Sequence, residues 1–81
     1  MRVIALAAVC GLAAACSNQT SEAERKYRMA ERAGESPAEL CQRAREVAEA
    51  YLNANRDLEY RTWSATAGLK CNQALLDGLA P

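Results

Sequence analysis

The sequence predicts an all-α protein, with a short N-terminal helix followed by an antiparallel helical hairpin that one disulfide clamps. Ala, Glu, Arg and Leu, which lose little conformational freedom in helices, are abundant in the chain. Apolar residues recur at helical spacing over about residues 37–54 and again over about residues 58–77. Cys41 and Cys71 lie within these two segments, at equal distances from a turn between them.

Residues 1–15 have the pattern of a cleavable signal peptide. Arg2 supplies a positive charge at the start, and residues 3–15 are apolar or small and carry no charge. As a helix rising ~1.5 Å per residue they would span roughly 20 Å, short of the ~30 Å hydrocarbon core of a bilayer. A buried core helix is the alternative, but polar residues 17–21 follow at once. We therefore expect export and removal of this leader.

The leader ends in the run Leu12-Ala13-Ala14-Ala15-Cys16. This run resembles the lipobox of bacterial lipoproteins, although Leu is commoner than Ala at the position of Ala13. The resemblance covers the first sixteen residues and implies diacylglycerol and an N-acyl chain, such as palmitate, on Cys16, with no other cofactor. By the sorting rule of such lipoproteins, Ser17 rather than Asp after the cysteine implies the periplasmic face of the outer membrane.

Ordinary secretory cleavage is the alternative, because the alanines before Cys16 also fit an A-x-A site. The number of cysteines favours lipidation. Cys10 leaves with the leader, so a lipidated Cys16 leaves Cys41 and Cys71 as an even pair, whereas an unmodified Cys16 would be an odd thiol. Two or three acyl chains anchor firmly, since each buried CH₂ contributes about 0.8 kcal/mol.

The mature chain would have about 66 residues, near the lower limit at which a core alone sustains a fold. We expect residues 16–21 to form a lipidated polar tether and residues 22–81 to form a small helical domain. The tether carries no charge and no apolar run.

The first predicted helix covers about residues 22–33. Ser21 and Glu24 fit a capping box, and Gly34 fits a left-handed stop. Its apolar positions are few: Ala23, Tyr27 and Ala30. We therefore expect a weak and partly exposed helix.

The second helix, about residues 37–54, has the clearest signals. Ser36 fits an N-cap, Pro37 the first helical position and Glu39 the third. Its apolar stripe consists of Leu40, Ala44, Val47 and Tyr51, flanked by Cys41, Ala48 and Leu52. This stripe predicts one buried face.

The third helix, about residues 58–77, follows turn-forming residues 53–57, of which Asp57 fits a cap. Its stripe consists of Tyr60, Trp63, Ala67, Cys71 and Ala74, with Leu75 and Leu79 beside it. Gly68 interrupts the stripe as a hinge or a point of close packing, and Gly78 predicts the end of the helix.

A hairpin that reverses near residue 56 places Cys41 beside Cys71 and Ala44 beside Gly68. We therefore expect a Cys41–Cys71 disulfide near the open end of the hairpin, as small exported domains often need such a bond. Two buried free thiols are the alternative. A metal site is disfavoured, because the chain has no His and its cysteines lack compact spacing.

Composition argues against several functions. With Arg2 removed, nine basic side chains remain against ten acidic ones, which offers no electrostatic footprint for nucleic acid. The absence of His removes the commonest general base, and no glycine-rich phosphate loop is present. We expect neither catalysis nor a small-molecule substrate.

Tyr51, Tyr60 and Trp63 cluster near the turn of the predicted hairpin. They either fill the core or form an aromatic patch at a tip that faces away from the membrane and binds a partner. We expect a structural or interaction lipoprotein that binds another envelope protein. The plasmid entry-exclusion type and the pilotin-like type of assembly lipoprotein are compatible with its size and location. A secreted effector without lipid is the alternative from another class.

Overall fold

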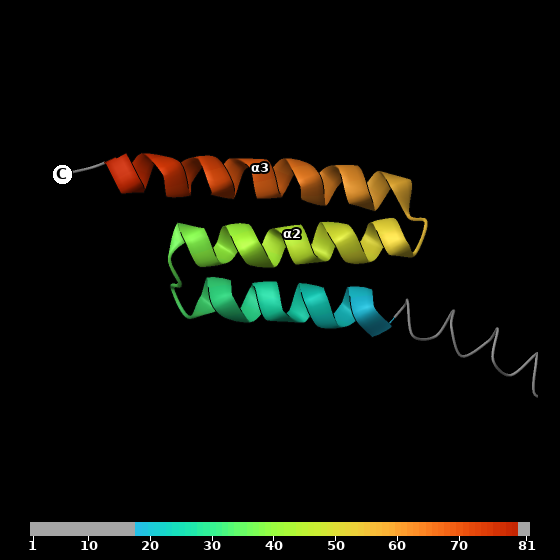
Figure 1. Ribbon diagram of the computed structural model, residues 1–81. Coiled ribbons are helices and arrows are strands. Elements are labelled where there is room, and N and C mark those ends of the chain that lie inside the picture. The colour runs from blue at the N-terminus through green and yellow to red at the C-terminus, as the bar shows by residue number, and fades with distance from the viewer. Residues whose placement is uncertain (1–17, 80–81) are drawn as a thin grey trace, which may run out of the picture.

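The computed structural model describes residues 18–79, which form three helices and no strand (Figure 1). A first helix occupies residues 18–32, α2 is Pro37–Asn53 and α3 is Asp57–Leu79. The predicted all-α class is thus confirmed for this part of the chain. The predicted leader and the predicted lipidation site Cys16 lie outside the described residues.

The start of α2 follows the predicted capping chemistry. The Ser36 side-chain oxygen accepts a hydrogen bond from the backbone N–H of Glu39 at 3.3 Å, and Pro37 is the first helical residue. Proline suits this position because its missing N–H would have no partner inside the helix. The last helical residue is Asn53, one residue before the predicted end.

The first reversal of the chain is a Schellman motif centred on Gly34. Gly34 has a φ of 70°, and its N–H donates to the carbonyl of Glu31 at 3.2 Å. The N–H of Glu35 donates to the carbonyl of Ala30 at 3.0 Å. These bonds satisfy the last carbonyls of the helix, and glycine adopts the left-handed conformation without steric cost. The predicted stop at Gly34 is confirmed.

The second reversal is a Schellman motif in which Asn55, at a φ of 58°, takes the left-handed position. The N–H of Arg56 donates to the Tyr51 carbonyl at 2.9 Å. The Arg56 carbonyl in turn accepts from the N–H of Tyr60 at 2.9 Å, so Arg56 also occupies the cap position of α3. The prediction that Asp57 caps α3 is therefore wrong: Asp57 is the first helical residue, because the turn needs only the three residues 54–56 between the two helices.

Two predicted helix boundaries also differ from the structure. Residues 18–21 are already helical, so Ser21 lies inside the first helix and does not cap it. No Gly or Pro occurs from residue 18 to residue 33, and extending an existing helix is easier than starting one. At the other end, α3 continues through Gly78 to Leu79, because a right-handed glycine weakens a helix without ending it.

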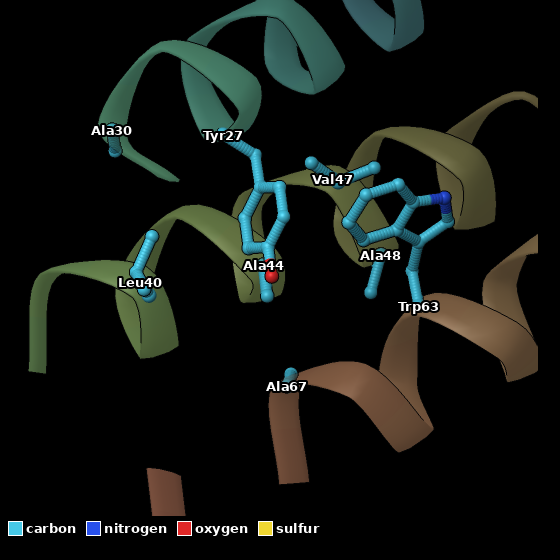
Figure 2. Packing of buried hydrophobic residues seen from close by; sticks show 8 residues of the cluster. All are labelled: Tyr27, Ala30, Leu40, Ala44, Val47, Ala48, Trp63 and Ala67. Atoms are coloured by element: carbon cyan, nitrogen blue, oxygen red, sulfur yellow. The ribbon is translucent and has the colours of Figure 1, made fainter. Parts of the chain in front are cut away.

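The core lies where the three helices meet (Figure 2). The first helix supplies more of it than expected, since Tyr27 is only 3% exposed and points between α2 and α3 toward Trp63. The long aromatic side chain of Tyr27 reaches across α2 to a residue of α3. The buried cluster consists of Tyr27, Ala30, Leu40, Ala44, Val47, Ala48, Trp63 and Ala67.

The predicted disulfide between Cys41 and Cys71 is confirmed. It joins α2 to α3 with a Cα–Cα distance of 4.7 Å and a sequence separation of 30 residues. The alternative of two free thiols is excluded. α3 lies alongside α2 (Figure 1), and this packing brings the two cysteines together.

The two roles considered for Gly68 are not seen. A Cβ added at Gly68 would meet no atom within 4 Å, so no neighbouring helix packs closely against this residue. Gly68 is also helical, with no positive φ, and α3 continues through it. The position of the turn near residue 56 predicts the level of Gly68 along the hairpin but not the direction in which this residue faces.

Candidate functional site

The three aromatic residues near the α2–α3 turn have different surroundings. Trp63 is 9% exposed and belongs to the core. Tyr51 is partly buried and donates a hydrogen bond from its hydroxyl to a carboxylate oxygen of Glu24 at 3.1 Å, which ties α2 to the first helix. Tyr60 is partly buried and lines a groove on another side. They do not form one exposed aromatic patch.

The α2–α3 turn lies at the same end of the molecule as the start of the described chain. A hollow is lined by Asn18 and Gln19 together with Asn53, the last residue of α2. The sequence suggested that this turn points away from a membrane attached through Cys16. The structure places it instead beside residues that follow Cys16 closely, because the first helix adds one more pass of the chain (Figure 1).

A groove of about 430 Å³ runs along the seam between α2 and α3. No residue of the first helix lines it, so that helix covers a different side of the seam. The lining residues are Arg45, Ala48, Glu49 and Leu52 of α2 and Tyr60, Ser64, Ala67, Gly68 and Cys71 of α3. This groove is the candidate binding surface.

The groove combines a shallow apolar floor with a charged edge. Ala48, Ala67 and Gly68 have small or no side chains, so the backbone of another helix can approach closely. Arg45 and Glu49 are exposed and supply both signs of charge. Such a surface suits an amphipathic helix with an apolar face and polar edges.

Sequence reasoning did not identify this groove, although it named several of its members for other reasons. Tyr60 was the only predicted partner-binding residue that lines it. Arg45 and Glu49 were missed, because polar residues on a helix are expected to face solvent. The available signal was their position next to the apolar stripe, one turn from Ala48 and Leu52.

The pKa shifts and ion pairs near the groove arise from burial and from nearby groups. Burial raises the pKa of Tyr51, and its hydrogen bond to Glu24 raises it further. At the start of α3, a hydrogen bond from the backbone N–H of Glu59 and the nearby Arg56 hold the pKa of the Glu59 carboxyl below its usual range. Over residues 18–79, every ion pair joins residues three or four apart, so none of them links one helix to another.

Comparison with protein-family models, curated proteins and solved structures finds no match to this chain. Within the three described helices, none is both long and apolar enough to cross a bilayer. The same residues contain no group of three His, Cys, Asp or Glu side chains placed to hold a metal ion. The basis for assigning a role is therefore the groove, the disulfide and the lipobox-like leader.

Proposed function

We propose that this protein is a small exported lipoprotein, anchored through Cys16, that binds another envelope protein. The proposed functional unit is the antiparallel α2–α3 hairpin, clamped by the Cys41–Cys71 disulfide and backed by the first helix. The observation that carries the proposal is the open groove between α2 and α3, which no element of the described chain covers. We propose no catalytic activity and no small-molecule cofactor.

The disulfide supports lipidation of Cys16. Cys41 and Cys71 pair with each other, so neither is available to Cys16. Cys10, the fourth cysteine, belongs to the predicted leader. A lipid thioether gives Cys16 a chemical role that needs no partner thiol, and the small residues before it fit that modification.

The proposed occupant of the groove is an amphipathic helix of the partner protein. From Tyr60 to Cys71 the groove extends about 16 Å along α3, which matches roughly three turns of a docked helix. Leu52 and Tyr60 would contact its apolar residues at one end, and Arg45 and Glu49 would select the charges along its edge. Since this end lies near the residues that follow Cys16, the partner would bind close to the membrane.

Labelling with palmitate in intact cells tests the anchor. We expect the wild type and a Cys10→Ser variant to incorporate the label and to fractionate with membranes. A Cys16→Ser variant should lose both properties, because the lipid would have no attachment site. A Cys16→Ser protein that is processed and membrane-bound like the wild type would contradict the anchor. A soluble wild-type product without lipid would favour the secreted effector.

A photo-crosslinking amino acid at Leu52 tests the groove in intact cells. We expect a discrete adduct with one partner protein, and no such adduct from the same probe at Arg32, an exposed residue of the first helix. The adduct alone is not decisive, so occupation of the groove must also be blocked.

Gly68→Leu adds a large side chain to a residue that lines the groove, and its Cβ would meet no atom within 4 Å, so the backbone need not move. Gly78→Leu is a matched control, because a Cβ at Gly78 would also meet no atom within 4 Å and this residue does not line the groove. We expect Gly68→Leu to abolish the Leu52 adduct and Gly78→Leu to retain it, with equal helical content by circular dichroism. An adduct that persists in Gly68→Leu would overturn the proposed docking site.

A further inference from the structure

The side of α3 that faces away from the core carries a second apolar stripe. Leu58, Leu69 and Leu76 are 75%, 57% and 67% exposed. They are separated by 11 and 7 residues, close to whole numbers of helical turns, so they lie along one line on the helix. Apolar residues on two opposite faces explain why α3 as a whole has no single apolar side.

Six positions at alternating spacings of four and three residues make up this line, which we call the outer seam. The outer seam consists of Leu58, Thr62, Ala65, Leu69, Asn72 and Leu76, all of them exposed. None of the six is charged. Alternating spacings of four and three are the pattern of a helix that packs lengthwise against another helix.

No other part of the described chain covers the outer seam. Leu69 lies two residues after Ala67, roughly 200° around the helix from the core. The groove is also distinct from it, because none of the six seam residues lines the groove. Three exposed leucines aligned on one helix form a continuous apolar stripe, and apolar stripes rimmed by polar residues often mark interaction surfaces.

We propose that the outer seam pairs with the outer seam of a second copy of this chain, with the two α3 helices antiparallel. The spacings along the outer seam (four, three, four, three and four residues) are the same when counted from either end. Turning one copy end for end pairs Leu58 with Leu76, Thr62 with Asn72 and Ala65 with Leu69. Such self-complementarity is the property that a two-fold symmetric interface requires.

The pairs also suit one another chemically. Leucines meet at both ends, and the small Ala65 faces the large Leu69 near the centre, which fills space better than two alanines would. Thr62 and Asn72 can form a hydrogen bond across the seam. A parallel arrangement would instead place Ala65 against Ala65, and these two small side chains would leave unfilled space near the middle of the contact.

The flanks of the seam tolerate this pairing. In the antiparallel arrangement Glu59 would lie near Gln73, and Arg61 would lie near Leu75. No two side chains of like charge are brought together, so repulsion does not oppose the contact.

The size of the seam predicts a weak association. From Leu58 to Leu76 it is about 27 Å long, and with a width of ~10 Å it offers roughly 270 Å² per copy, against ~800 Å² in a standard interface. Anchoring in one bilayer would raise the local concentration of the copies, and this step rests on the proposed lipidation. Both anchors reach the same bilayer when the paired helices lie along its surface.

Cysteine cross-linking of the full chain tests the pairing and its direction. Leu58→Cys and Leu76→Cys are carried on separately tagged copies, coexpressed and treated with a short bismaleimide. We expect a mixed Leu58→Cys/Leu76→Cys dimer and no dimer of Leu58→Cys with itself, since those two sites would lie about 27 Å apart. An Arg32→Cys pair on the first helix is the background control.

Substitutions within and beside the seam test its specificity. Leu69→Glu should lower the mixed dimer at least roughly tenfold, because the carboxylate would lose its water on the seam. Met29→Glu, at a residue of 56% exposure on the first helix, lies away from α3 and should leave the mixed dimer unchanged. A dimer of Leu58→Cys with itself, or a mixed dimer that survives Leu69→Glu, would overturn the proposal.

Loss of the lipid anchor and absence of pairing through the outer seam give different experimental results. With Cys16→Ser in the background, the mixed dimer should fall in cells and return when the purified chain is concentrated. Absence of the mixed dimer both in cells and in concentrated solution overturns the seam, whatever the state of Cys16.

Discussion

Tyr27 and Trp63 meet edge to face, with ring centroids 5.1 Å apart and planes at 80°. This contact joins the first helix to α3 within the core that α2 shares with both (Figure 2). The Arg28 guanidinium lies 5.7 Å from the Trp63 ring centroid and 5.9 Å from that of Tyr27, so a cation covers both rings. Such aromatic pairs stabilise by more than the area they bury, so this pair helps to hold the first helix against α3.

Tyr27→Ala should lower the free energy of unfolding by about 3 to 5 kcal/mol, because it removes a buried aromatic ring and leaves a cavity beside Trp63. Urea unfolding followed by the fluorescence of Trp63, the only tryptophan, measures this change. Met29→Ala, at an exposed site on the same helix, should change stability by less than about 0.5 kcal/mol. Equal unfolding midpoints for the two variants would contradict the structural role of Tyr27.

Replacing both Cys41 and Cys71 with Ser should destabilise the domain by about 3 to 4 kcal/mol, since the bond closes a 30-residue separation and restricts the unfolded chain. Denaturant titration of the oxidised wild type and the double variant measures the difference. Reduced wild type should match the double variant. A reduced protein as stable as the oxidised one would refute this expectation.

Two glycines should respond in opposite directions to alanine. Gly68→Ala should stabilise the protein by about 0.5 to 1 kcal/mol, because the new methyl group meets no atom and alanine is the better helix former. Gly34→Ala should destabilise it by about 1 to 2 kcal/mol, because Gly34 has a φ of 70°. Thermal melting of the two variants gives the comparison, and a stabilised Gly34→Ala would disprove the left-handed turn.

The structure predicts a loss of stability at alkaline pH. Burial raises the pKa of Tyr27 above its ordinary value of 10.0, and Glu31 adds to this while Arg28 opposes it. Burial and the hydrogen bond to Glu24 also raise the pKa of Tyr51. The unfolded chain therefore loses these protons first, so their contribution is complete below about pH 10 and disappears as the pH rises through the folded pKa values.

Spectrophotometric titration of tyrosine ionisation checks this prediction. Tyr51→Phe should remove one of the late-titrating groups, and Glu24→Gln should move the pKa of Tyr51 toward 10.0, because the acceptor carboxylate is lost. A Tyr51 that ionises below pH 10 in the folded protein is the contrary result.

Local chemistry explains which features the sequence could predict. Ser36, Pro37 and Gly34 act through their own backbone geometry, so their roles are readable without knowledge of the fold. The Cys41–Cys71 bond was also predictable, since the number of cysteines and the midpoint between them both point to that pair.

Features that depend on packing direction were not predictable in the same way. Tyr27 looks like one apolar residue on a thin stripe, and its burial depends on a seam that two other helices form. One apolar stripe was identified on α3, but Leu58, Leu69 and Leu76 form another on the opposite side. A helix with two apolar sides gives a weak periodic signal, which hides the second one.

The bond between Cys41 and Cys71 makes the strength of this fold depend on where the chain folds. In a reducing cytosol both sulfurs would stay as thiols, and so small a domain would open and close readily. Such a loosely held polypeptide is easy to thread through a narrow channel. In an oxidising space the bond closes, and the same chain then resists unfolding and proteolytic attack. The redox state of the compartment therefore decides whether the two cysteines form their bond, and with it how stable the fold is.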